Sequence, residues 1–321
     1  MQIAISKMNE FGLKKQPFLF IIDYEMQKPI VMKLEQAESY NLFYRIDNQT
    51  NYNFNNQIKN EIKITKGPIS FEHYKVAFDL IQKHIRRGNS FLVNLTKPTP
   101  IEINLNLLEI FECTKAKYQL YFNNQFVTFS PETFVKIESN IISSHPMKGT
   151  ISAEIPDAEN IILQNKKELA EHTTIVDLIR NDLSKVANNV WVERFRYVEK
   201  ISTDTSDILQ VSSEIKGRLP ENWASNIGNI LFELLPAGSI CGAPKPETLK
   251  IIKEAEGYDR NYYTGIFGIF DGENLDSGVM IRFIEKTPNG LVFKSGGGIT
   301  AQSIAENEYN EMIDKVYLPI N

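Results

Sequence analysis

The sequence predicts an α+β fold. Strand-like runs follow one another in hairpin-like series, and long helical segments are interspersed among them instead of alternating with single strands. No GxGxxG motif follows a predicted strand, so a doubly wound nucleotide-binding fold is not indicated. The chain has 321 residues, of which 42% are hydrophobic. This is enough for a large core, in one big domain or two.

The first 65 residues are predicted to be a short strand-rich portion packed on a larger unit. Apolar and polar residues alternate there in three runs, "PFLFIIDY", "KPIVMKL" and "YNLFYRI". The Asn/Gln-rich segment at 47–61 is predicted to be a loop. We therefore divide the chain at residue 65, with the main domain at residues 66–321.

The main domain is predicted to open with a helix at about residues 70–87. Apolar residues recur there at helical spacing, and Gly88 ends the pattern. Strand-like runs follow, and the pattern becomes helical from about 160 to 187 and strand-like again to about 202. Mixed segments lead to a closing helix at 303–317, which begins with a capping-box pattern from Ser303 to Glu306.

Composition excludes several classes of protein. The net charge is −5 and the pI is about 5.6, so no basic field indicates nucleic-acid binding. The two cysteines and four histidines form no CxxC or HExxH pattern, and "SGGGIT" lacks the lysine of a phosphate-binding loop. Because no stretch reaches 18 apolar residues, we expect a soluble cytoplasmic protein without a membrane span.

Two predicted helices carry acidic residues beside their apolar stripe. In the helix at 166–187, Glu168 and Glu171 lie on the same side as the apolar residues that follow. A buried carboxylate is costly unless something pairs with it. Alternatively, the first turns of this helix project past the core, where the helix dipole favours acids.

The closing helix repeats the spacing with Glu308 and Glu311. Read alone, Glu311 and Lys315 are an i,i+4 surface pair. Read together, the two helices present four carboxylates, which repel one another unless a divalent cation lies among them. Oxygen ligands suit Mg²⁺, which keeps several waters and binds substrate oxygens.

The motifs of this chain resemble those of the chorismate-utilising enzymes, and most closely those of aminodeoxychorismate synthase component I. The resemblance covers roughly residues 70–318. It rests on "FSPETF", "HPMKGT", "KELAEHTTIVDLIRNDL", "PAGSICGAPK", "EGYDRNYYTGIFG", "VMIRF", "GGGIT" and "ENEYNEMIDK", in this order. It implies two large, mainly antiparallel sheets packed together with helices outside, an active site in the cleft between the halves, and a chorismate-binding catalytic domain at 66–321.

The same resemblance implies roles for individual residues. Glu171 and Glu311 would bind Mg²⁺, and Glu168 and Glu308 would reach the metal directly or through water. The groups that hold chorismate would be Tyr263, Arg282, Lys315 and the amides of Gly297 and Gly298, with Thr150 and Ser213 as pocket hydroxyls. Outside the family context, Arg282 would be read as a strand-surface residue and Tyr263 as a core aromatic residue.

Lys148, the residue before Gly-Thr in "HPMKGT", distinguishes the reactions of this family. Aminodeoxychorismate synthases have lysine there, whereas anthranilate and isochorismate-type members usually have a small residue. An uncharged lysine amine can add at C2 of chorismate and expel the C4 hydroxyl, after which ammonia attacks C4 and the lysine leaves. The simpler alternative is that Lys148 forms a salt bridge with a carboxylate.

Two positions depart from the family pattern. Leu92 stands where amine-using members have Gln and isochorismate-type members a Lys base, which argues against water activation at C2. Gln210 stands where several members have His. Glu168 or Glu308 in protonated form would then have to assist departure of the hydroxyl. Cys241, where Thr is common, is expected to be tolerated.

We expect ammonia to come from a separate glutamine amidotransferase subunit. Cys113 lies in a predicted helix and Cys241 in a Gly-rich motif, and neither resembles the activated cysteine that glutamine hydrolysis needs. The predicted product, 4-amino-4-deoxychorismate, would serve 4-aminobenzoate and folate synthesis. The alternatives are anthranilate synthase component I, which also uses chorismate, Mg²⁺ and ammonia, and a non-catalytic chorismate-binding subunit. Retention of Lys148 and the four glutamates argues against the second alternative.

Overall fold

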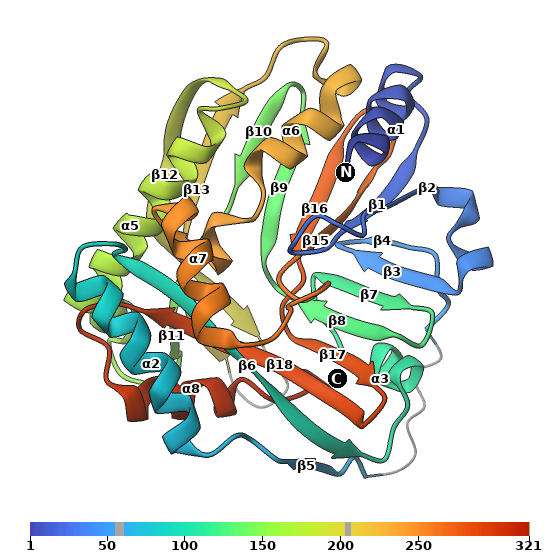
Figure 1. Ribbon diagram of the computed structural model, residues 1–321. Coiled ribbons are helices and arrows are strands. Elements are labelled where there is room, and N and C mark those ends of the chain that lie inside the picture. Colours follow the sequence, from blue (N-terminus) through green and yellow to red (C-terminus); the bar gives the residue numbers. More distant parts are fainter. Residues whose placement is uncertain (55–60, 203–206, 321) are drawn as a thin grey trace.

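The computed structural model of the protein describes residues 1–54, 61–202 and 207–320. Part of the loop predicted at 47–61 lies outside the described residues. The described part contains two large antiparallel sheets with helices around them, which confirms the predicted fold class (Figure 1).

Each sheet has nine strands among the described residues. The first sheet runs in the order β11 (Met147–Ser152), β13 (Asp207–Arg218), β10 (Ile141–Ser144), β9 (Thr133–Glu138), β16 (Leu275–Val279), β15 (Ile266–Phe270), β1 (Phe18–Ile22) and β2 (Ile30–Lys33), and β12 (Asn188–Ser202) pairs with β13. The second sheet runs in the order β14 (Gly242–Ala243), β6 (Leu92–Ile103), β18 (Gly290–Ile299), β17 (Phe283–Thr287), β8 (Phe126–Ser130), β7 (Tyr118–Phe122), β3 (Leu42–Ile46) and β4 (Gln49–Thr50), and β5 (Ile64–Lys66) pairs with β6. The residues before 66 thus belong to both sheets.

The chain crosses between the sheets several times, and two of these crossings are neighbours. One crossing joins β8 to β9, and the other joins β16 to β17. The crossings are hydrogen-bonded to adjacent strand ends, from Val279 N to Glu132 O at 3.0 Å and from Phe129 N to Arg282 O at 3.1 Å. Glu132 and Arg282 are therefore fixed at the junction of the two sheets.

The sheets share a core where they face each other. On β1, Leu19 and Ile21 pack into this shared core, while Phe18, Phe20 and Ile22 face the helices on the other side. A strand that is buried on both faces is a continuous apolar run in sequence, and "FLFII" is such a run.

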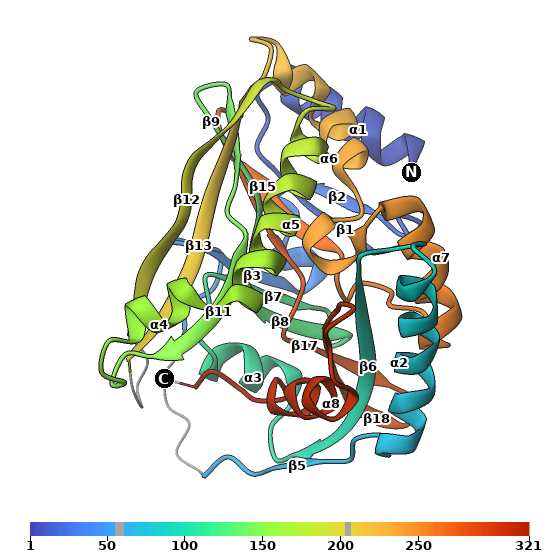
Figure 2. The ribbon, with the colours of Figure 1, turned by 90° about the vertical axis from the view of Figure 1, so that its left-hand side faces the viewer.

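The helices cover the outer faces (Figure 2). The α-helices are α1 (Gln2–Leu13), α2 (Phe71–Arg86), α3 (Leu107–Cys113), α4 (Ala158–Gln164), α5 (Lys166–Leu183), α6 (Ile227–Leu234), α7 (Lys245–Glu256) and α8 (Ala305–Asp314). The short 3₁₀ helices are η1 (Leu34–Gln36), η2 (Glu38–Tyr40), η3 (Trp223–Asn226) and η4 (Gly238–Ile240). Helix α5 lies against β11, β12 and β13, and α8 lies against β18. None of the helices in the described residues is long and apolar enough to cross a membrane.

Two local features differ from the sequence-based expectation. Residues 2–13 form helix α1, which packs on η3 and α6, and so closely on η3 that a Cβ on Gly12 would lie 1.8 Å from the Ala224 carbonyl oxygen. The predicted capping box at Ser303 is wrong, because α8 begins at Ala305 and the Ser303 hydroxyl instead accepts a hydrogen bond from Thr300 N.

Candidate active site

A cleft of about 800 Å³ opens at the junction of the sheets. Its walls come from α5, α8, β6, β11, β18 and the two crossing segments. The volume lies within the usual range for small-molecule sites. Of the residues selected from the sequence, those that line the cleft are Lys148, Thr150, Glu168, Glu171, Tyr263, Arg282, Gly297, Gly298, Glu308, Glu311 and Lys315.

The glycines of β18 bring the α8 side chains close to the strand. A Cβ on Gly297 would lie 3.5 Å from Glu308 Oε2, 3.6 Å from Glu311 Oε1 and 3.7 Å from Lys315 Nζ. Strand β17 runs beside β18 only as far as the pair Phe283–Lys294, so beyond that point β18 has a strand partner only on its β6 side. The missing side chain at Gly297 therefore leaves room for a ligand beside the two carboxylates and the amine.

Lys148 approaches the glycines of β18 from the wall of the cleft opposite α8. A Cβ on Gly298 would lie 3.9 Å from Lys148 Nζ and 2.9 Å from Leu92 Cδ1. The register of β11 against β13 shifts between Met147 and Thr150, and bulges of this kind redirect side chains. Leu92, the first residue of β6, thus places an apolar side chain at the same point of β18.

The four glutamates come from two helices on different walls. Glu168 and Glu171 lie on α5, and Glu308 and Glu311 lie on α8. In the described part of the chain, no three His, Cys, Asp or Glu side chains are gathered closely enough to hold a metal. Mg²⁺ is nevertheless often held by one or two carboxylates, with substrate oxygens and water completing its shell. The all-oxygen donor set facing one cleft fits such an ion.

Glu311 and Lys315 form the i,i+4 pair that the sequence indicated, with Nζ 2.7 Å from Oε1. The pair lines the cleft, and Lys315 Nζ also donates to Gly296 O at 2.9 Å. Binding of a cation to Glu311 and of an anion to Lys315 would separate two groups that now neutralise each other.

Arg282 supplies a second positive group at the sheet junction. Its backbone is in the left-handed region with φ of 54°, and its guanidinium lies 4.4 Å from the centre of the Tyr317 ring. Arg282 Nη1 is buried without a hydrogen-bond partner in the described structure, which leaves a donor for an anionic ligand. The nearby Tyr263 hydroxyl remains protonated, because burial raises its pKa.

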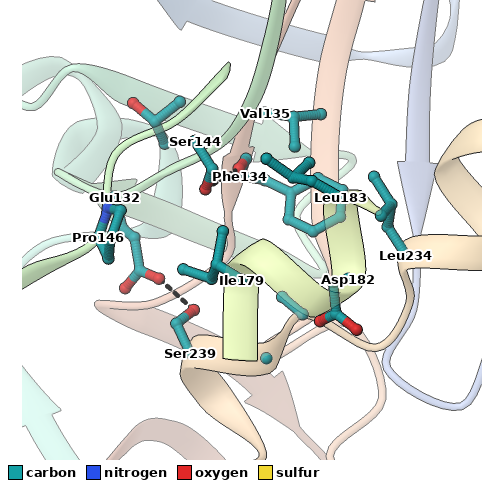
Figure 3. Close-up of a pocket in the computed structure, with 13 residues that line it drawn as sticks. Glu132, Phe134, Val135, Ser144, Pro146, Ile179, Asp182, Leu183, Leu234 and Ser239 are labelled. Atoms are coloured by element: carbon teal, nitrogen blue, oxygen red, sulfur yellow. Dashed lines mark hydrogen bonds between the residues drawn. The ribbon is translucent and has the colours of Figure 1, made fainter. Parts of the chain in front are cut away.

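Glu132 is the residue that sequence reasoning missed. It belongs to the quoted motif "FSPETF" but was given no role there. Part of the residue reaches the cleft, while its carboxyl group is enclosed and accepts a hydrogen bond from Ser239 Oγ (Figure 3). Burial raises the pKa of this carboxyl, although Ser239, Lys148 and Lys315 each act to lower it. The cleft therefore contains a carboxylic acid that stays protonated to higher pH than an ordinary glutamate.

The interpretation of Ser213 as a pocket hydroxyl is corrected by the structure. Ser213 is fully buried behind the cleft wall and is absent from the described lining. Its Oγ accepts a hydrogen bond from Arg196 N at 2.9 Å and lies 2.7 Å from His172 Nε2. The serine thus fixes the ring of the histidine that follows Glu171, and burial lowers the pKa of His172 to about 4.

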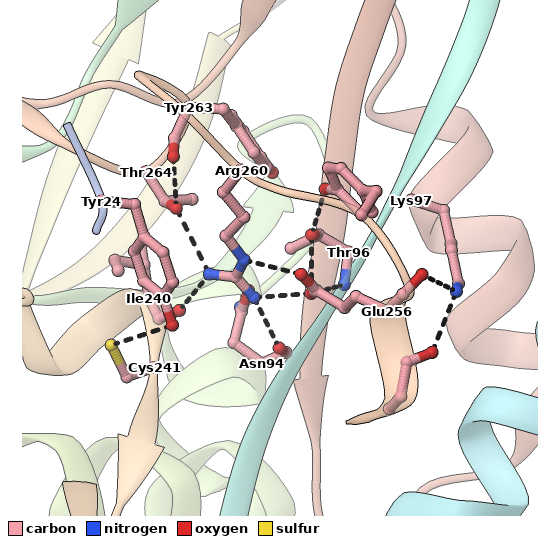
Figure 4. A network of polar contacts seen from close by, with 12 residues as sticks. Tyr24, Asn94, Thr96, Lys97, Ile240, Cys241, Glu256, Arg260, Tyr263 and Thr264 are labelled. Atoms are coloured by element: carbon pink, nitrogen blue, oxygen red, sulfur yellow. Dashed lines mark hydrogen bonds and ion pairs between the residues drawn. The ribbon is translucent and has the colours of Figure 1, made fainter. Parts of the chain in front are cut away.

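A buried ion pair supports the floor of the cleft (Figure 4). The Arg260 guanidinium donates to both carboxylate oxygens of Glu256, at 2.9 and 2.6 Å. It also donates to the backbone oxygens of Ile240 and Asn94, both at 2.9 Å, and these two residues line the cleft. Glu256 accepts from Thr96 N at 2.8 Å. This network ties α7, β6 and the η4 segment together beneath the site.

Comparison with known proteins places the chain in a family. The family model described as chorismate binding enzyme matches residues 6–320, which is nearly the whole chain. The protein belongs to the chorismate-binding enzyme family. The match includes most of the strand-rich residues before 66.

Individual relatives carry different names. The chain is 53% identical over 317 residues to an uncharacterized PabA-like protein of Pasteurella multocida, covering 98% of both chains. It is 30% identical over 266 residues to aminodeoxychorismate synthase component 1 of Bacillus subtilis, covering 78% of this chain and 55% of that one. The crystal structure of anthranilate synthase component I from Streptococcus pneumoniae matches with a TM-score of 0.68 at 26% identity, covering 80% of this chain and 59% of that one. The chain therefore spans little more than half the length of these two synthase components.

Proposed function

We propose that this family member is an aminodeoxychorismate synthase component I, which converts chorismate and ammonia to 4-amino-4-deoxychorismate. The observation that carries the proposal is the position of Lys148. Its amine enters the cleft over Gly298, on the wall opposite the α8 residues Glu308, Glu311 and Lys315. A ring anchored by its carboxylates near Lys315 and Arg282 would have one face toward this amine.

Lys148 then acts as a nucleophile. Its neutral amine forms a bond to C2 of the ring, the double bond shifts, and the C4–oxygen bond breaks. The proton for the departing hydroxyl comes from Glu132, so water leaves and Glu132 becomes a carboxylate. Ammonia attacks C4, the double bond returns, and the C2–nitrogen bond breaks to give back the Lys148 amine. We thus assign to Glu132 the role of proton donor, which the sequence analysis had given to Glu168 or Glu308.

Mg²⁺ would be held by Glu171 and Glu311, with Glu168 and Glu308 reaching it directly or through water. When bound, the ion supplies positive charge that neutralises a substrate carboxylate and lets it enter an acidic cleft. Lys315 would release Glu311 to the ion and donate its hydrogen bonds to the substrate instead. Arg282 Nη1, Tyr263 and the Gly297 and Gly298 amides would complete the recognition of the anionic groups.

The ammonia would come from a separate glutamine amidotransferase. Glutamine hydrolysis needs a thiolate, and burial raises the pKa of both Cys113 and Cys241 to about 11. Both cysteines are buried and neither is suited to attack glutamine. The reaction would belong to 4-aminobenzoate and folate synthesis in the cytoplasm, with free ammonia as a substitute in vitro.

The test compares the wild-type protein with Lys148→Ala and the charge-retaining Lys148→Arg. The pure proteins are incubated with chorismate, Mg²⁺ and ammonium, and the products are separated with and without an added lyase. The proposal predicts lyase-dependent 4-aminobenzoate from the wild type, and loss of at least about 10³-fold in both variants, because a nucleophile and not a charge is required. Unchanged circular dichroism and thermal unfolding would show that the variants are folded. Full activity of Lys148→Ala would reject the nucleophile.

Anthranilate synthase component I is the second candidate, supported by the fold match to the Streptococcus pneumoniae enzyme. It would give directly fluorescent anthranilate without the lyase. A chorismate-binding subunit without activity would bind chorismate and form neither product.

A further inference from the structure

A second cavity, of about 30 Å³, lies behind Glu132 (Figure 3). Glu132 and Ser239 line both this cavity and the substrate cleft, so the carboxyl group stands between the two spaces. At its other side the cavity is lined by Asp182, with the apolar side chains of Val135 and Ile179 among the walls.

The cavity has the size and polarity to hold water. A volume of 10–15 Å³ accommodates one water, so about two fit here. The polar residues that line the cavity, and that would bind such waters, include Glu132, Ser144, Asp182 and Ser239. Two to four such partners are what an internal water needs.

Asp182 connects this cavity to the surface. Its carboxylate lies 2.5 Å from Lys245 Nζ and 3.0 Å from Lys185 Nζ. The Lys185 side chain is 44% exposed, whereas that of Asp182 is only 9% exposed. A hydrogen-bonded path can thus run from solvent through the Asp182 cluster to the back of Glu132, without entering the cleft.

The proposed reaction requires a proton at this place in every turnover. Glu132 gives one proton to the departing hydroxyl, while ammonia becomes a protonated amine on C4 and Lys148 leaves as a neutral amine. In the net reaction, chorismate, ammonia and one proton are converted to water and a product whose amine is protonated. No step of the cycle returns the proton to Glu132, so a proton from solvent must reach its carboxyl group before the next turnover.

We propose that the cavity between Glu132 and Asp182 is a proton path that reprotonates Glu132 from solvent while the cleft is occupied. This inference rests on the proposed function, because that function makes Glu132 the proton donor. Asp182 is a relay residue that does not touch the substrate, and the cavity waters carry the proton over the remaining distance.

The test separates the first turnover from the following ones. Val135→Ile adds one methylene to the cavity wall, and Val211→Ile adds the same group at a buried β13 position outside the described lining of both spaces. Rapid-quench experiments with enzyme in excess measure the first turnover, for which the proposal requires no new proton at Glu132. Steady-state assays measure the repeated cycle.

For Val135→Ile we expect a first-turnover rate within about twofold of wild type and a steady-state rate lower on the order of tenfold, with a larger solvent isotope effect on the latter. Asp182→Asn should likewise lower the steady-state rate and leave the first-turnover rate nearly unchanged. This variant provides the test if Val135→Ile does not fold. Val211→Ile should leave both rates unchanged. The proton path would be overturned if a folded cavity variant lost the first-turnover and steady-state rates equally, or lost neither. Absence of 4-amino-4-deoxychorismate from the wild type would instead reject the proposed function itself.

Discussion

The three consecutive glycines of β18 allow one substitution to be compared at adjacent positions. A Cβ on Gly296 would lie 2.2 Å from Leu95 O and 2.7 Å from Thr96 Cα, both of them backbone atoms of β6. The strands must part to accept it, and overpacking of this kind costs 1–3 kcal/mol or more. We therefore expect Gly296→Ala to lower the free energy of unfolding by about 3 kcal/mol, or roughly 4–5 °C in Tm.

Gly297→Ala should instead leave stability nearly unchanged and lower activity. Its nearest atoms are the ends of three flexible side chains at 3.5–3.7 Å, which is ordinary contact distance, so we expect a stability change within about 0.5 kcal/mol. The added methyl group fills the space beside Glu308, Glu311 and Lys315, where the substrate carboxylate and the ion would lie. Turnover of chorismate should fall at least about 10²-fold, since small misplacement of a bound substrate has effects of this size.

The assay combines urea unfolding, followed by circular dichroism, with chorismate consumption in the presence of Mg²⁺ and ammonium. Gly298→Ala is the intermediate case, because its closest contact is the movable tip of Leu92 at 2.9 Å. Wild-type stability in Gly296→Ala, or full activity in a stable Gly297→Ala, would refute the geometry on which the site is built.

Three further outcomes are expected. Glu256→Gln leaves the buried Arg260 without its counter-charge and should cost about 3–5 kcal/mol in urea unfolding, whereas Glu247→Gln, at an exposed position of the same helix, should cost less than about 1 kcal/mol. EDTA should abolish chorismate turnover, and Mg²⁺ should restore it, without a change in Tm of the free protein, because no described element needs a metal to fold. Burial lowers the pKa of His145 to about 4, so the folded protein keeps it neutral while the unfolded chain takes up a proton near pH 6.5. Stability should therefore fall as the pH drops from about 6.5 to 4, by roughly 2 kcal/mol at pH 5, and His145→Gln should remove this part of the loss in unfolding titrations.

Local periodicity predicted most strands and the long helices, because those segments bury one face or both faces in a regular pattern. The run at 17–24 became β1, and the helix predicted at 70–87 is α2. Helix α1 could not be foreseen in this way. Its burial depends on close approach to residues more than 200 positions later, around Ala224 and Gly228, and no local pattern records that contact.

The candidate site was predictable where a residue type is needed for its chemistry. The paired glutamates, Lys148 and the glycine run all belong to motifs that stand out in sequence, and the structure brings them to one cleft. Ser213 was expected in the pocket from the family resemblance alone, and the structure buries it behind the cleft wall. Glu132 was missed because its importance depends on enclosure at the crossing between β8 and β9, which only the three-dimensional arrangement creates.

The groups proposed to bind the substrate and the groups proposed to react with it come from different sheets, which explains how one fold can serve more than one reaction. The groups proposed to anchor anions come mainly from the second sheet and its flank, namely β18 and α8, together with Arg282 at the junction. The groups proposed to act on the ring, Lys148 and Glu132, come from β11 and from the entry to β9 in the first sheet. A substitution at Lys148 can therefore change which bond forms on the ring while the anion-binding groups stay in place. On this reasoning, relatives named for different products should differ at the position of Lys148 and agree at the positions of Gly297, Glu311 and Lys315. A Lys148→Ala variant that still binds chorismate, as measured by calorimetry with Mg²⁺, would establish that the two functions are separable.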